Sequence, residues 1–150
     1  MVDVRRYFED FTVGETFTTP GVEVTTDEIV AFATQYDPQY FHTEPESAAA
    51  SVFGEHVASG WHTAALTMRL WHDHGPPVEG GLIGLGVEDL RWGPLRGGDR
   101  IHVVGEVVET RPSRSGAPRG VVRLRLRTLT DRDTEVQHMV AAILVPARGR

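Results

Sequence analysis

The stretch from Gly60 to about His72 most constrains the fold, because its apolar residues recur at helical spacing and also cover much of the remaining helix surface. A helix that is apolar nearly all round is normally buried. The rest of the chain should therefore wrap around this helix. The pattern consists of Trp61, Ala65, Met68 and Trp71 on one face, with Ala64, Leu66 and Leu70 covering much of the rest.

Four long stretches with β-strand character follow the break at Gly75-Pro76-Pro77. Turn residues separate them, around residues 93–99, 112–118 and 130–133. In the third stretch apolar residues alternate with Arg, so one face should be packed and the other solvated. We interpret the Arg ladder as a solvated face, with a phosphate-binding surface as the alternative. The predicted strands run from about Leu82 to Arg91, Arg100 to Thr110, Gly120 to Thr130 and Glu135 to Val145.

The first half of the chain predicts one short strand and further helices. Glu15 to Thr19 has strand character, and a capping box at residues 25–28 begins a helix that runs from about Thr26 to Gln35. A short helix is expected within residues 43–50. An antiparallel sheet of about five strands wrapped around the apolar helix satisfies both patterns. We therefore predict an α+β fold, with residues 1–150 as a single domain.

The composition excludes several classes of function. The sequence has no Cys, which excludes disulfides, thiolate chemistry and cysteine-ligated zinc. All 15 basic residues are Arg, so a Schiff-base or P-loop lysine is also excluded. The net charge of −6 argues against nucleic acid or an anionic membrane as a partner. Because Met1–Arg6 lacks a secretory apolar region and no run approaches the ~20 apolar residues of a membrane helix, we expect a cytoplasmic protein.

Two short patterns are candidates for a functional site. Asp37 and His42 place a carboxylate and an imidazole five residues apart, after the predicted helix end. They suit an acid/base pair, although Asp37 could be only a turn residue and His42 an exposed loop residue. The second pattern, Ser59-Gly60, begins the apolar helix, where unpaired amides and the helix dipole suit a developing negative charge. Gly60 permits a close approach of a ligand or simply tight packing, and Ser59 is a helix N-cap.

Other residues have weaker functional interpretations. His56 and His62, and the cluster His72-Asp73-His74, lack the i, i+4 spacing of a helical zinc site, so no metal is expected. The aromatic and Met side chains of the apolar helix are interpreted first as core or dimer-interface residues and second as an acyl pocket. Those side chains are Trp61, Met68 and Trp71.

The chain resembles the MaoC-like dehydratases and (R)-specific enoyl-CoA hydratases of the hot-dog fold. The resemblance lies in the opening at residues 7–14, the Asp37-x4-His42 pair, residues 58–63 at the start of the apolar helix, and the strand-rich second half. The family motif is Asp-x-Asn-Pro-x-His, and this sequence has Gln39 and Tyr40 at its Asn and Pro positions. A Pro occurs instead at Pro38, and Ser59-Gly60 replaces a common His-Gly pair.

The resemblance implies a hot-dog fold and a hydratase or dehydratase that acts on an enoyl or 3-hydroxyacyl-CoA thioester. It implies that Asp37 and His42 activate water, that the Gly60 N–H holds the thioester carbonyl, and that the pocket includes Tyr40, Ser59 and Trp61. The expected partner is the CoA thioester, with no cofactor beyond the coenzyme A of the substrate, and the expected assembly is a homodimer or a dimer of dimers. Two alternatives are an acyl-CoA thioesterase and a non-catalytic acyl-CoA-binding domain.

Overall fold

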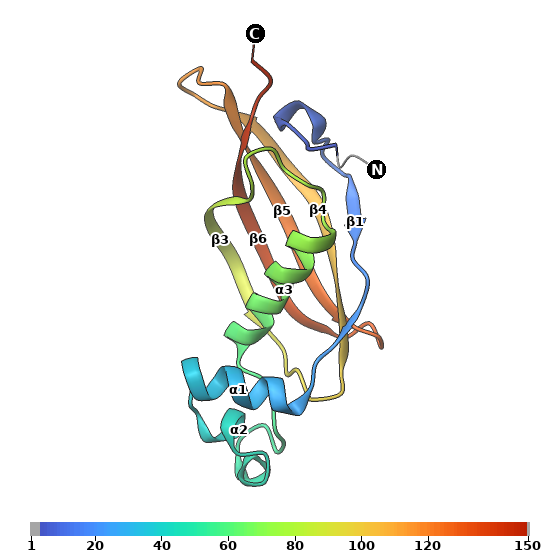
Figure 1. Cartoon of the computed structure of the whole chain (residues 1–150), viewed down its shortest axis with the longest axis vertical. Helices are drawn as coiled ribbons and strands as arrows, with labels where there is room; N and C mark the ends of the chain where they lie inside the picture. Colours follow the sequence, from blue (N-terminus) through green and yellow to red (C-terminus); the bar gives the residue numbers. More distant parts are fainter. Residues whose placement is uncertain (1–3, 150) are drawn as a thin grey trace.

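The computed structural model describes residues 4–149, so part of the N-terminal stretch considered above, Met1–Asp3, lies outside the described residues. One antiparallel sheet of six strands has the helix α3 lying across one of its faces (Figure 1). The predicted α+β architecture is confirmed. The strands are β1 (Thr16–Thr18), β2 (Val22–Glu23), β3 (Ile83–Trp92), β4 (Arg100–Pro112), β5 (Arg119–Thr130) and β6 (Glu135–Pro146), and the helices are α1 (Thr26–Tyr36), α2 (Tyr40–Thr43) and α3 (Gly60–His74), with 3-10 turns η1 (Phe8–Asp10) and η2 (Ser47–Ala50).

The sheet order is β1-β4-β5-β6-β3, and the short β2 pairs with the beginning of β4. The last three strands follow one another as hairpins, whereas β3 reaches the far edge beside β6 after the chain has crossed the sheet as α3. Within residues 4–149, β3 pairs only with β6, so its other side is an open edge. The α1 and α2 helices lie at the end of the molecule where α3 begins (Figure 1).

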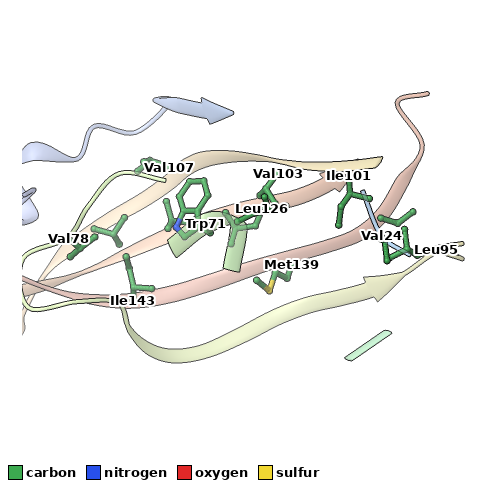
Figure 2. Packing of buried hydrophobic residues seen from close by; sticks show 14 of the residues in the cluster. Val24, Trp71, Val78, Leu95, Ile101, Val103, Val107, Leu126, Met139 and Ile143 are labelled. Carbon is green, nitrogen blue, oxygen red and sulfur yellow. The ribbon is translucent and has the colours of Figure 1, made fainter. Parts of the chain in front are cut away.

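The core lies between the sheet and α3. Along β5, Val122, Leu124 and Leu126 are buried, which confirms the predicted packed face. On the opposite face the intervening Arg side chains pair with carboxylates of the adjacent strands, at 2.9 Å for Arg123–Glu109, 3.3 Å for Arg125–Glu106 and 3.1 Å for Arg127–Glu135. Figure 2 shows the packing of the core, with Val24, Trp71, Val78, Leu95, Ile101, Val103, Val107, Leu126, Met139 and Ile143 labelled.

The prediction that α3 is buried nearly all round is wrong for this chain. Trp61 is 58% exposed and Met68 is 46% exposed, because a single sheet covers only one side of the helix. The covered side instead includes two threonines, Thr63 and Thr67, together with Trp71. Trp71 is therefore a core residue, as expected, while Trp61 and Met68 are available to a ligand or a second copy of the chain.

The segment between α1 and α3 differs from its predicted form. The helix α1 begins as predicted, with the Thr25 hydroxyl accepting the Glu28 N–H at 3.2 Å. The loop expected around Tyr40 contains the helical turn α2, and the helix expected within residues 43–50 is only the turn η2. Segments of one turn are too short for their own hydrogen bonds to offset the free-energy cost of helix nucleation, so tertiary contacts determine their form. The strand β2 was not predicted.

No helix within residues 4–149 has both the length and the apolar character needed to cross a membrane.

Candidate active site

Three segments converge at the beginning of α3. Asp37 is the C-cap residue of α1, His42 lies in α2, and Ser59 and Gly60 begin α3. The Nε2 atom of His42 lies 3.5 Å from Oδ2 of Asp37. The structure thus brings together the two patterns that the sequence placed about twenty residues apart.

His42 is held in one orientation by the backbone of the segment before α3. It is 6% exposed, and its Nδ1 lies 2.7 Å from the carbonyl oxygen of Val57. Because a carbonyl only accepts hydrogen bonds, Nδ1 must carry the proton and donate it. In the neutral imidazole, Nε2 is then an acceptor, and this is the nitrogen that faces Asp37. The interpretation of His42 as an exposed loop residue is therefore wrong.

Asp37 is fixed from the side of α3. The Ser59 hydroxyl donates a hydrogen bond of 2.7 Å to Oδ2 of Asp37 and accepts the Trp61 N–H at 3.3 Å. Ser59 is fully buried. Its predicted role as the N-cap is confirmed, but its contact with Asp37 was missed, since no local pattern links residues 22 positions apart.

The Asp37 carboxylate and the Nε2 of neutral His42 are both hydrogen-bond acceptors. Two acceptors 3.5 Å apart cannot satisfy each other, but a water molecule above them can donate one hydrogen to each. Either group can then take a proton from that water. The arrangement is suited to general acid–base chemistry on a bound water.

The structure confirms the packing role suggested for Gly60 and leaves its N–H free for the other. A Cβ atom at this residue would lie 2.3 Å from Cδ2 of Trp92, so tight packing alone requires glycine. Within residues 4–149, no hydrogen-bond acceptor is paired with the Gly60 N–H. This amide, at the positive end of the α3 dipole, is therefore available to an oxygen that gains negative charge.

The surroundings of the site are largely aromatic. Tyr40 is exposed, and its ring contacts Phe41 edge-on with 5.4 Å between centroids. Trp61 meets Trp92 in the same way at 4.8 Å. Two of the three predicted pocket residues, Tyr40 and Trp61, therefore lie at the surface, whereas the third, Ser59, is buried.

An apolar cavity of about 390 Å³ lies between α3 and the sheet, at the side of β3. The sequence did not predict this cavity, because its walls come from four elements. They include both Met68 and Trp71, for which core and acyl-pocket roles had been left open. Its principal side chains are Met68, Trp71, Leu85, Val87, Leu126 and Met139.

His62 is buried in the first turn of α3, and its ring stacks on that of Phe32 with 4.7 Å between centroids. Its Nδ1 has no hydrogen-bond partner among the described residues. Burial lowers the pKa of the His62 imidazole below its usual value, and the Glu28 carboxylate acts in the opposite direction. His72 pairs with Asp73 at the exposed end of α3, and residues 4–149 contain no group of three or more His, Asp or Glu side chains placed to hold a metal ion.

A helix lying across one antiparallel sheet, together with the similarity to hot-dog-fold structures, makes this chain a hot-dog-fold protein, as predicted. The chain belongs to the MaoC-like domain family, whose sequence model matches residues 9–128.

Relatives of known structure or activity agree with this assignment. A MaoC-like dehydratase from Rhodospirillum rubrum is 42% identical, with a TM-score of 0.92 over 97% of this chain and 99% of that one. The R-hydratase PhaJ1 from Pseudomonas aeruginosa is 26% identical, with a TM-score of 0.75 over 95% of this chain and 86% of that one. The 3-hydroxyacyl-thioester dehydratase Z of Mycobacterium tuberculosis is 34% identical over 91 residues, which are 58% of this chain and 60% of that protein.

Proposed function

We propose that this protein is a hydratase/dehydratase that acts reversibly on enoyl and 3-hydroxyacyl-CoA thioesters. The observation that carries the proposal is the 3.5 Å separation of two fixed acceptors, Oδ2 of Asp37 and Nε2 of His42, beside the unpaired N–H of Gly60. The names of the related R-hydratase and 3-hydroxyacyl-thioester dehydratase support the same reaction.

Hydration requires a base for water, a proton for C2 and stabilisation of the thioester oxygen. Asp37 and His42 hold one water and take a proton from it as its oxygen bonds to C3. The electron pair of the double bond moves toward the thioester, where the Gly60 N–H stabilises the negative oxygen. Asp37 and His42 then return a proton to C2 on the same face, and dehydration is the reverse reaction. Each member contributes typically about 10² to 10⁴-fold. These steps need no cofactor beyond the coenzyme A of the substrate.

We also propose where the acyl group and a second copy of the chain bind. The acyl group extends from Gly60 past Trp61 toward the 390 Å³ cavity, whose walls are almost entirely apolar. A second copy of the chain covers the open edge of β3 and its exposed apolar side chains, which include Leu85 and Val87. A homodimer therefore encloses the cavity that each protomer leaves open.

The test is a panel of crotonyl-CoA and longer enoyl-CoA thioesters, with loss of absorbance at the enoyl band as the readout. Asp37→Asn and His42→Ala should each lower kcat by about 10² to 10⁴-fold. His74→Ala, an exposed imidazole at the far end of α3, is the matched control and should retain full activity. Turnover that survives in both site variants would overturn the mechanism.

Thioester hydrolysis is a second candidate, because the same activated water could attack the carbonyl carbon of the thioester in place of C3. Release of free thiol from saturated acyl-CoA substrates distinguishes this reaction from hydration, which releases none. Ligand binding by calorimetry without turnover on any thioester would instead indicate a binding domain, the third alternative.

A further inference from the structure

The indole of Trp92, the last residue of β3, lies directly against the first turn of α3. A Cβ atom on Gly60 would come within 2.3 Å of Cδ2 and 2.5 Å of Cε3 of this ring. Trp92 is 40% exposed, and its ring also meets the ring of Trp61 edge-on. The ring therefore touches the same turn that presents the Gly60 N–H and the Ser59 hydroxyl.

A chain of hydrogen bonds in the core fixes the orientation of this ring. The indole Nε1 donates to Oε1 of Gln137 at 2.8 Å, and Nε2 of Gln137 donates to the Thr67 hydroxyl at 3.1 Å. Thr67 donates to the Thr63 carbonyl at 2.8 Å and lies 2.6 Å from the Thr128 hydroxyl. A hydroxyl has one hydrogen and two lone pairs, so Thr67 must accept from both Gln137 and Thr128. The direction of every hydrogen bond in the chain is therefore fixed.

Burying the polar groups of this chain carries a desolvation cost that only well-formed hydrogen bonds offset. Gln137 is 1% exposed, and the hydroxyls of Thr67 and Thr128 are fully buried, so all three lose their hydration. Apolar side chains would pack the same space without that cost. The hydrogen bonds are satisfied in only one arrangement, and they join α3 to β5, to β6 and, through the indole, to the end of β3.

We propose that Trp92 is a positioning residue for the thioester site. Held by Gln137, its ring fixes the first turn of α3 so that the Gly60 N–H points at the thioester oxygen. This inference rests on the proposed function, in which that N–H is the donor. Because the Gly60 N–H must point in a fixed direction, the hydrogen bond from the indole N–H to Gln137 is needed in addition to the packing of the ring.

Two variants separate the hydrogen bond from packing. Trp92→Phe keeps an aromatic ring on Gly60 but removes the N–H, and Gln137→Leu removes the acceptor and leaves the ring in place. Each should lower kcat by roughly tenfold with little change in KM, since a displaced donor costs less than a deleted one. Gln35→Leu, the same change at an exposed position of α1, should have no effect.

The second readout does not depend on turnover. The N–H residual dipolar coupling of Gly60 reports the direction of this bond, whereas its chemical shift would also respond to the ring current of the adjacent indole. The coupling should change in Trp92→Phe and in Gln137→Leu, and it should stay the same in Gln35→Leu. Wild-type kcat in both variants of an active enzyme would overturn the positioning role and leave the proposed function intact. If the wild-type protein turns over no thioester, the proposed function fails, and an unchanged Gly60 coupling would then overturn the positioning role as well. Should Gln137→Leu fail to fold, Trp92→Phe carries both measurements.

Discussion

The hydroxyl of Ser59 at the start of α3 donates a hydrogen bond of 2.7 Å to the carboxylate of Asp37 at the end of α1. The same hydroxyl accepts the Trp61 N–H, so one oxygen joins two helix ends. The direction of the Asp37 carboxylate is thereby tied to the first turn of α3, which also presents the Gly60 amide.

Replacing Ser59 should therefore affect catalysis as well as stability. Ser59→Ala removes an N-cap, which costs about 0.5–2 kcal/mol of unfolding free energy, and also frees Asp37 to rotate. We expect a lower kcat for hydration in this variant, and Ser59→Thr should retain most of the activity. Thr25→Ala is the matched control, because it removes the N-cap of α1 without touching Asp37. Equal kcat values for Ser59→Ala and Thr25→Ala would contradict the link.

The buried His62 predicts a loss of stability in mild acid. Burial lowers the pKa of this imidazole in the folded protein, so the unfolded chain binds more protons once the pH falls below the usual His value of ~6.5. The free energy of unfolding should therefore fall as the pH decreases through that value. His62→Phe, which can keep the stacking on Phe32, should flatten this part of the profile. Urea unfolding between pH 8 and pH 5 (roughly the range in which His titrates) measures the difference, and parallel profiles would refute it.

The hydroxyl of Thr67 should contribute more to the free energy of unfolding than the hydroxyl of an exposed helical threonine. Thr67→Val leaves the Gln137 amide and the Thr128 hydroxyl without their buried acceptor, which costs about 1–3 kcal/mol. Thr34→Val is the control, since that hydroxyl bonds the Val30 carbonyl on the exposed side of α1. Chemical denaturation should show a clear loss for Thr67→Val and little change for Thr34→Val. A loss of equal size in both would argue against a connected chain.

The open edge of β3 predicts a dimer that a single charge can disrupt. Val87 is exposed on this strand and lines the cavity, so Val87→Glu should place a carboxylate in the interface. We expect light scattering coupled to size exclusion to show a dimer for the wild-type chain and a shift toward monomer for the variant. Val52→Glu, at an exposed valine far from β3 in the sequence, should remain dimeric. A monomeric wild-type protein would contradict the prediction.

The sequence by itself determined the long helices and the long strands. The alternation of Val122, Leu124 and Leu126 predicted the packed face of β5, and the caps at Thr25 and Ser59 predicted where α1 and α3 begin. These signals are local because helix and strand periodicity, and capping hydrogen bonds, involve residues only a few positions apart.

Tertiary structure alone decided which side of α3 is covered and how the site is connected. Hydrophobicity could not show that Thr67 would be buried and Met68 exposed, because that choice depends on where the sheet packs. The contacts of Ser59 with Asp37 and of Gln137 with Thr67 join residues 22 and 70 positions apart. No periodic pattern carries such pairings, since they form only when distant segments meet in the folded chain.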